Sequence, residues 1–440
     1  MKKIVLILSV FISIAACQNK KKTVKKQKPE SNKVEILVKG KDYSASAPYL
    51  FKNGDKIIVN WTEQKEKNTF LKYKIFDTNS NKFGQTYEVP SAKGLQLHEE
   101  SMAKIGKDTK NTLYAFYRRR DRNSRSMFGG YMYYSFSTDQ GKTWSKEQKL
   151  VKDTTSTSQS FYDIALLPDG TIGLSWLDSR KPIDKELKGK TLYFASTNNQ
   201  HKIENEKPVA GSTCECCRTD IYVDSLNTIH IAYRNIIQPG EKGFITQKEE
   251  AKRKGLKNID SLDFWDNDTE IRDMYYIYST DQGKNFTKPV PIYRDNWHIS
   301  GCPHTGPSLA LNQDLLGAVW FTGKPNEEGI YFNTKKQNDS LFSPKKKYIS
   351  KEGRHPQMIA LNGNFYAVYE EYYEKDGKGY EKIVLETIDK NRKSSTREVS
   401  AALTRNNHAV LYNIDNHHLF IVWVNTDTKY KKLQYRILKI

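Results

Sequence analysis

The chain has 440 residues, with 71 lysines and arginines against 51 acidic residues, which gives a formal net charge of +20. The lysines of the body are dispersed, with no long basic helix and no basic-aromatic platform, and this argues against nucleic acid as a partner. Twenty-seven tyrosines, 18 phenylalanines and seven tryptophans accompany short alternating apolar runs, a composition typical of an all-β protein.

The amino-terminal segment predicts export and lipid anchoring. After a short basic start, the apolar run 4–16 is too short for a membrane-spanning helix, which needs about 20 residues. The run closes on Ile14 to Cys17, the pattern of a lipoprotein signal peptide (1–17) with Cys17 as the lipidated residue. Residues 18–33 hold seven lysines and should form a disordered tether. We therefore expect a protein of the bacterial cell envelope, facing the periplasm or the cell surface, that contacts membrane only through its anchor.

From residue 34 onward the chain repeats one unit, which consists of an apolar strand, a polar turn and a second strand ending in an aromatic residue. The run 34–39 would supply the missing outer strand of the last unit and close the ring, which leaves no open sheet edge. The sequence therefore predicts one all-β domain, 34–440, folded as a β-propeller of four-stranded blades, seven by count. The units are Leu50–Trp61, Ile105–Tyr117, Leu166–Trp176, Tyr222–Tyr233, Leu309–Trp320, Ile359–Tyr369 and Leu411–Trp423.

Two near-identical turns support this architecture. Residues 137–144 read Ser-Thr-Asp-Gln-Gly-Lys-Thr-Trp, and residues 279–286 read Ser-Thr-Asp-Gln-Gly-Lys-Asn-Phe. The aspartate can accept backbone N–H bonds across the turn, the glycine supplies a positive φ, and the aromatic plugs the hairpin. Both turns resemble the Asp-box (BNR repeat) of the sialidase superfamily. The resemblance implies a sialidase-like propeller that binds an anionic glycan and, if it is an enzyme, hydrolyses it as an exo-sialidase does. It also implies six blades, where the count gives seven.

The resemblance carries over no catalytic residue. Sialidases grip the substrate carboxylate with three arginines, the first of which belongs to an Arg-Ile-Pro element. Here the early strand reads Ala-Ser-Ala-Pro-Tyr at 45–49, and Arg-Ile-Pro occurs nowhere. The cysteines described below are foreign to the sialidase machinery, and the chain is similar to a cysteine-containing bacterial subgroup of sialidase-like proteins.

The loops that enter the inner strands should converge on one mouth of the central channel, where a concave ligand site is expected. When the units are placed in register, histidine or cysteine recurs in these loops. Seven residues before the last apolar position of the inner strand come His98, Ser160, Cys216 and His304, and six residues before it come Cys217, His355 and His408. The register therefore predicts four histidines at similar places around one rim.

The cysteines admit three interpretations. Cys214, Cys216 and Cys217 precede the fourth blade, and Cys302 precedes the fifth beside His304, so adjacent blades should bring them together. Export permits two disulfides that would use all four thiols. A cage of thiolates and imidazoles for zinc or copper is the second interpretation, and a redox-active dithiol is the third.

Charged residues at the ends of second strands and in the entry loops are expected at the same face. Arginines around a channel mouth suit a carbohydrate or another anionic small ligand, because a guanidinium binds a carboxylate bidentately. The candidates are Arg118, Asp178, Arg180, Arg218, Arg234, Arg354 and Glu371.

An insertion at about 236–270 interrupts the fourth unit. It contains a charged, helix-like piece, 246–254, and the aromatic pair Phe264-Trp265. A loop of this length on the binding rim is typical of a lid or a partner surface. Three functions follow in order: binding or hydrolysis of an anionic glycan, a metal- or thiol-dependent envelope protein built on the Cys/His cluster, and a non-catalytic scaffold that holds an envelope partner at the insertion.

Overall fold

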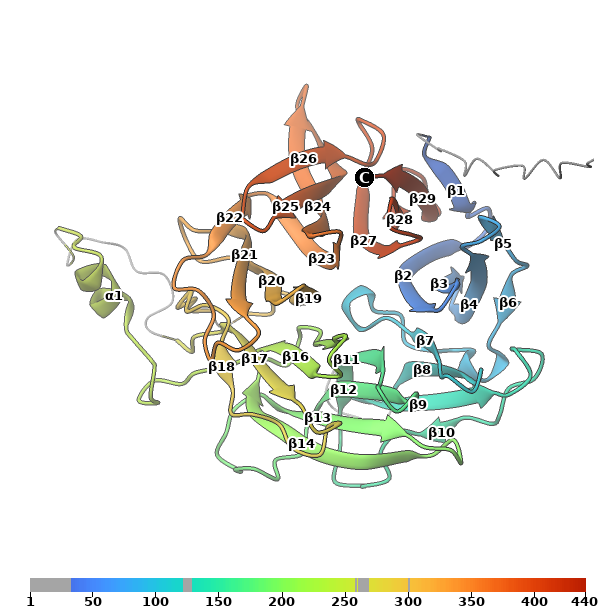
Figure 1. Cartoon of the computed structure of the whole chain (residues 1–440), viewed down its shortest axis with the longest axis horizontal. Coiled ribbons are helices and arrows are strands. Elements are labelled where there is room, and N and C mark those ends of the chain that lie inside the picture. The colour runs from blue at the N-terminus through green and yellow to red at the C-terminus, as the bar shows by residue number, and fades with distance from the viewer. Residues whose placement is uncertain (1–32, 122–128, 258, 260–268, 300) are drawn as a thin grey trace, which may run out of the picture.

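The computed structural model describes residues 33–121, 129–257, 259, 269–299 and 301–440. Within them, seven antiparallel sheets follow one another around a central channel (Figure 1). This confirms the all-β propeller with seven blades by count, so the six blades implied by the sialidase resemblance are wrong for this chain. The predicted signal peptide with Cys17, and the tether up to residue 32, lie outside the described residues. In the part that is described, no helix combines the length and the apolar character of a membrane span.

Each blade begins with an inner strand that lines the channel and continues into a second, almost wholly buried strand. The inner strands are β2 (Ser44–Asn53), β7 (Lys104–Lys107), β11 (Gln159–Leu166), β15 (Asp220–Val223), β19 (Ser308–Asn312), β23 (Gly353–Leu361) and β27 (Asn406–Asn413). The second strands are β3 (Lys56–Lys65), β8 (Leu113–Arg120), β12 (Ile172–Asp178), β16 (Ile229–Arg234), β20 (Leu315–Thr322), β24 (Asn364–Lys375) and β28 (His418–Asn425).

The third and outer strands complete the blades. The third strands are β4 (Asn68–Asp77), β9 (Gly130–Ser137), β13 (Lys190–Thr197), β17 (Met274–Ser279), β21 (Gly329–Lys336), β25 (Lys378–Asp389) and β29 (Lys432–Lys439). The outer strands are β5 (Lys82–Phe83) with β6 (Tyr87–Glu88), then β10 (Gln148–Lys149), β14 (Ile203–Thr213), β18 (Val290–Pro291), β22 (Lys347–Ser350), β26 (Ser394–Glu398) and β1 (Glu35–Val38). The helices are α1 (Gln247–Arg253) and two 3-10 turns, Pro90–Ala92 and Glu99–Ser101.

The ring is closed by the strand that the sequence predicts for this purpose. β1 pairs antiparallel with β29, with Glu35 opposite Tyr435, so the last blade combines both ends of the described chain (Figure 1). This closure removes the free edge between the first and last blades.

One aromatic residue of every second strand fills the space between neighbouring blades, and these are the residues that end the seven sequence units. Each is at most 1 % exposed, and the hydrophobic clusters around them combine residues of adjacent blades. Large rings supply much of the buried apolar area, which is the main driving force for packing blade on blade. They are Trp61, Tyr117, Trp176, Tyr233, Trp320, Tyr369 and Trp423.

The two repeated turns have the bonding that their sequence predicts. The Asp139 carboxylate accepts from the Thr143 backbone N–H at 2.9 Å, and Asp281 accepts from Asn285 N–H at the same distance. Gly141 and Gly283 have φ of 88° and 78°. Both turns join a third strand to an outer strand, which places them on the rim opposite the ends of the second strands.

Candidate functional site

The channel mouth is shaped by a backbone irregularity that recurs near the start of the inner strands. In β2, β11, β23 and β27 the pairing register shifts there, and each shift contains a non-glycine residue with positive φ: Ala47, Phe161, His355 and His408 (48–54°). His304, just before β19, has φ 48°. Such backbone is uncommon outside glycine, although histidine tolerates it better than most, and it concentrates at functional sites. A backbone with positive φ therefore occurs at three of the four predicted rim histidines, His304, His355 and His408.

The structure brings all four rim histidines together. They line one cavity of about 370 Å³ together with Leu97, Glu99, Glu100 and Lys431. The rings of His98 and His304 have centroids 5.7 Å apart, and those of His355 and His408 are stacked with centroids 4.2 Å apart. Segments from blades 2, 5, 6 and 7 thus meet at one point.

A second cavity, of about 410 Å³, shares His355 and His408 with the first. We call the two together the mouth groove. Its second part lies over blades 6 and 7, and its other lining residues are Glu352, Arg354, Glu370, Tyr372, Glu381, Arg405, Asn407 and Thr426.

His355 is held as a cation. Its Nδ1 forms a short hydrogen bond with Glu370 Oε1, and its Nε2 lies 3.2 Å from the His304 carbonyl oxygen. Burial disfavours the charged ring, but the Glu370 carboxylate outweighs burial and raises the pKa of His355 to about 9. At neutral pH the imidazolium therefore donates from both nitrogens.

His408 is held neutral beside it. Burial lowers the pKa of His408 below its ordinary value, and the neighbouring His355 cation lowers it further. The His408 backbone N–H donates to Glu370 Oε2 at 3.1 Å, and its Nδ1 lies 3.5 Å from a Glu99 oxygen. Burial, followed by His304, also lowers the pKa of His98. A protonated and a neutral imidazole thus stack within one groove.

A buried ion pair supports the floor of the groove. Arg218 Nε lies 3.4 Å from Glu100 Oε2, with both side chains 4 % exposed. Arg218 also donates to the carbonyls of Pro307 at 2.8 Å and Pro356 at 2.9 Å, while Glu100 accepts from Gly306 N–H at 3.1 Å. Arg218 is therefore a brace between blades 4, 5 and 6, since its hydrogen bonds are made with the protein itself.

The other predicted arginines mostly bond to the protein as well. Arg118 donates to the Gln159 carbonyl at 2.7 Å, and Arg234 donates to the carbonyls of Arg272 and Phe321 at 2.9 Å each. Arg354 alone among the predicted arginines lines the mouth groove, stacked over the Phe321 ring with its guanidinium carbon 4.2 Å from the centroid.

Asp178 and Arg180 form an internal pair. Arg180 Nη2 lies 2.8 Å from Asp178 Oδ2, which also accepts from the Trp176 indole N–H at 3.1 Å. Asp178 is fully buried, so it serves to anchor the ring of Trp176 between blades.

The charged groups expected at this face include the pair Glu370-Glu371, and the structure separates the two: Glu371 bonds to Ser350 and Lys382, whereas Glu370 faces the histidines. Two other carboxylates of the groove, Glu99 and Glu100, were not predicted from the sequence. Both residues directly follow His98 in the predicted rim loop, and this position could have identified them as residues of the site.

The four cysteines separate into a cluster of three and one outlying residue. Cys214 Sγ lies 3.6 Å from Cys216 Sγ and 3.9 Å from Cys217 Sγ, and all three residues are at most 2 % exposed. Cys302 is exposed and does not belong to this group among the described residues. His355 and His408 lie in a different group, so among the described residues the cysteine cluster includes no histidine and does not include Cys302.

Glu100, His355 and His408 also offer ligand atoms within 4.8 Å of one another. However, both ring nitrogens of His355 already have partners, Glu370 and the His304 carbonyl. In this arrangement neither nitrogen of His355 is open to a metal ion.

Below the groove, the channel itself encloses about 420 Å³ and contains buried charges that the sequence reasoning did not select. Lys104 Nζ lies 3.7 Å from Asp163 Oδ1, and burial lowers the pKa of Lys104 to about 8. Burial, and then Asp163, raise the pKa of Asp220 to about 7. These inner-strand residues create a polar channel whose charge state changes near neutral pH.

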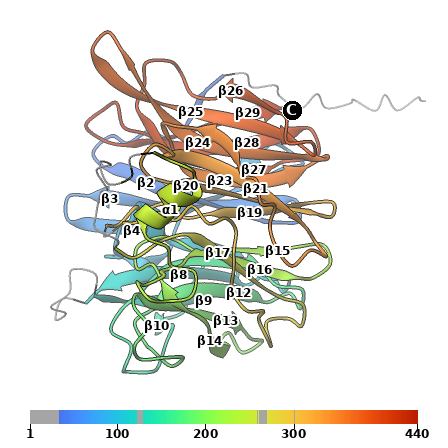
Figure 2. The ribbon, with the colours of Figure 1, turned by 90° about the vertical axis from the view of Figure 1, so that its left-hand side faces the viewer.

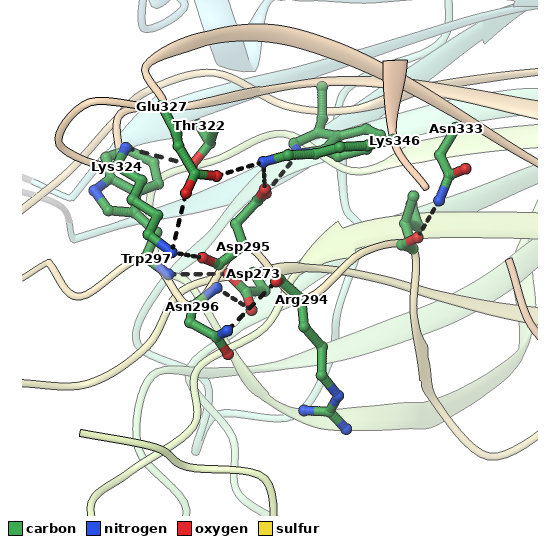
Figure 3. Close-up of polar contacts among 12 residues, drawn as sticks. Asp273, Arg294, Asp295, Asn296, Trp297, Thr322, Lys324, Glu327, Asn333 and Lys346 are labelled. Carbon is green, nitrogen blue, oxygen red and sulfur yellow. Dashed lines mark hydrogen bonds and ion pairs between the residues drawn. The ribbon is translucent and has the colours of Figure 1, made fainter. Parts of the chain in front are cut away.

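The described part of the insertion does not cover the mouth. Helix α1 lies outside the ring at the left of Figure 1 and in front of the blades in Figure 2, which views the ring from that side, and Glu250 and Lys254 pair with Lys324 and Glu327 after β20. Figure 3 shows the anchoring cluster, in which Lys346 bridges Asp295 and Glu327. The expected position over the binding face is therefore wrong for this part. Phe264 and Trp265 lie outside the described residues.

No protein-family model matches the sequence, and no curated protein matches it. Among solved structures, the chain is similar to an ulvan lyase of polysaccharide lyase family PL25, with a TM-score of 0.56, 9 % identity, and 92 % of this chain and 96 % of that chain covered. It is also similar to the polysaccharide lyase Uly1 (TM-score 0.53, 11 % identity, 94 % of both chains). The NanB sialidase of Streptococcus pneumoniae matches with a TM-score of 0.46 at 10 % identity over 94 % of each chain. At these identities the likeness establishes the β-propeller fold, which this chain shares with proteins that act on glycans.

Proposed function

We propose that the mouth groove binds an acidic polysaccharide and cleaves it by β-elimination next to a uronate. The observation that carries the proposal is the stacked pair of imidazoles, His355 held protonated and His408 held neutral, 4.2 Å apart. Neighbouring groups whose surroundings drive their pKa values apart are suited to opposite roles in acid–base chemistry.

The reaction needs a base and a cation at one place. Neutral His408 accepts, on a ring nitrogen, the proton on the carbon next to the uronate carboxylate. Arg354 and Arg405, which line the adjoining part of the groove, supply positive charge for the carboxylate as charge develops on it. The bond to the leaving oxygen breaks, a carbon–carbon double bond forms in the uronate ring, and the proton is passed to the leaving oxygen.

Carboxylate-based hydrolysis fits the groove less well. Most glycoside hydrolases use two carboxyl groups that flank the scissile glycosidic bond. Here Glu99 pairs with Lys431 at 2.8 Å, Glu100 pairs with Arg218, and Glu370 pairs with His355. Among the described groove residues, His408 has no carboxylate hydrogen-bonded to its ring, so it is the group placed to accept a proton.

The second part of the groove has the features of a subsite for an acidic sugar. Arg354 and Arg405 line it, and Tyr372, 44 % exposed, offers an aromatic surface for a sugar ring. The likeness to polysaccharide lyases, one of them solved with a glucuronate-containing saccharide, makes uronate polysaccharides the class to test.

The test is incubation of the chain from Gln18 onward, which keeps all seven blades, with ulvan, alginate, pectate, chondroitin and a neutral glucan. Ultraviolet absorbance reports the unsaturated product, and a reducing-end assay reports any cleavage. We expect the unsaturated product from at least one uronate polymer and none from the glucan. Reducing ends without the double bond, or no cleavage of any uronate polymer, would refute β-elimination.

A further inference from the structure

We infer that Cys214, Cys216 and Cys217 form a trigonal three-thiolate site for copper(I), separate from the mouth groove. The three sulfurs lie within 4.8 Å of one another, with two separations of 3.6 Å and 3.9 Å. Three sulfurs bound to a single ion at about 2.3 Å in one plane would be about 4.0 Å apart. The thiols therefore already stand close to the spacing that one ion requires.

The chemistry of the donor set selects the ion. The group contains three sulfurs and, among the described residues, no imidazole or carboxylate. Structural zinc sites are almost always held by four protein ligands, and magnesium and calcium require oxygen ligands. Thiolate ligands favour soft ions, of which copper(I) is the one suited to three sulfurs.

The surroundings offset the negative charge of three thiolates around a monovalent ion. Arg272 Nη1 donates to Cys214 Sγ at 3.3 Å, and Glu270 and the Gly301 carbonyl hold the Arg272 guanidinium in place. Cys214 N–H donates to the Arg234 carbonyl at 2.8 Å, which fixes the loop to the end of β16. A partly buried donor aimed at a ligand sulfur is the kind of support that metal sites use.

The site is buried but lies directly under the surface. Glu215, between the first two cysteines, is exposed, while the three cysteines are at most 2 % exposed. An ion can thus reach the sulfurs by movement of a short loop, and water is excluded once it is bound. Cys217 is followed by Arg218, so a bound ion would also fix the loop that carries the brace beneath the groove.

The chain from Gln18 onward is reduced without oxygen and titrated with copper(I) in the presence of a chromophoric copper(I) chelator, with zinc(II) in a parallel titration. We expect one copper(I) per chain and an X-ray absorption spectrum with three sulfur neighbours at about 2.3 Å. Cys214→Ser, Cys216→Ser and Cys217→Ser should each abolish stoichiometric retention, and Arg272→Met should weaken it about 10- to 100-fold. Cys302→Ser is the matched control and should bind like the parent.

Three results would overturn the proposal. The first is retention of copper(I) no greater than in Cys214→Ser, and the second is equal loss in Cys302→Ser. The third is zinc(II) held in preference, with a fourth ligand in its absorption spectrum. Where a serine variant does not fold, as judged by circular dichroism, the sulfur count in the spectrum of the parent chain decides alone.

Discussion

The clearest consequence of the groove geometry concerns Glu370. This carboxylate holds the proton on His355, so Glu370→Gln should lower the pKa of His355 well below about 9, because only the weaker contribution of the Glu100 carboxylate then opposes burial. Glu371→Gln is the matched control. The neighbouring side chain bonds to Ser350 and Lys382 and leaves the histidine untouched.

The size of the effect follows from the pKa. Each unit is worth about 1.4 kcal/mol, so the rise of the His355 pKa from 6.5 to about 9 corresponds to about 3 kcal/mol. Because the His355 side chain is 21 % exposed, we expect about 2 kcal/mol in practice. The folded chain holds this proton more tightly than the unfolded chain. The contribution is therefore complete below pH 6.5 and disappears as the pH rises through about 9.

The assay is urea unfolding of the parent, Glu370→Gln and Glu371→Gln, near pH 6 and near pH 9.5, with histidine titration followed by NMR. Glu370→Gln should lose about 2 kcal/mol near pH 6 and much less near pH 9.5. An equal loss at both pH values would refute the assignment of His355 as a cation. A titration of the His355 ring itself near pH 6.5 in the parent would refute it as well.

Four further results are expected. Arg218→Met should lower the free energy of unfolding by about 3–5 kcal/mol, because Glu100 is left buried without its partner; a loss below about 1 kcal/mol would contradict the brace. Trp176→Ala should cost about 3–5 kcal/mol in the same urea assay, since the ring is fully buried between blades. Asp220→Asn should flatten the fall in stability between pH 3.8 and about 7, because folding raises the pKa of Asp220 and the folded chain therefore binds its proton more tightly across this interval; an unchanged pH profile would exclude this role. Glu250→Lys should make α1 more sensitive to protease without altering polysaccharide cleavage, and lost cleavage would restore the lid interpretation.

Much of the architecture could be predicted because it repeats. The aromatic residue that ends each sequence unit, such as Trp61 or Trp423, is the residue that fills the space between blades, so the count of units was the count of blades. The closing strand could be predicted because the last unit lacked one. Because the same packing contact recurs in every blade, the same pattern of apolar strand and closing aromatic residue recurs in the sequence. This pattern could be counted seven times.

The site was predicted only where the repeat itself carries it. The four rim histidines occur at two adjacent register positions, and the structure brings them together around the mouth groove. The partners of each charged group could not be predicted, because they depend on side-chain direction. Glu370 and Glu371 are adjacent in sequence, yet alternation along β24 sends one to His355 and the other to Lys382.

The arginines illustrate the same limit. Arg118, Arg218 and Arg234 lie near strand ends at the expected rim, but each donates to a backbone carbonyl of the next blade. A sequence shows that a cation is present near a rim, whereas the direction of its hydrogen bonds is decided by the backbone around it.

The measurement that tests the central claim most directly is the rate of formation of unsaturated uronate by the parent, His408→Gln and His201→Gln on the best polymer of the panel. His201 packs against Phe136, in a turn away from the groove, and is the control. The account predicts that His408→Gln loses at least about 100-fold in rate, the contribution of a general base, while His201→Gln keeps the parent rate. Equal rates for all three proteins would contradict the assignment of the mouth groove as the site of proton transfer.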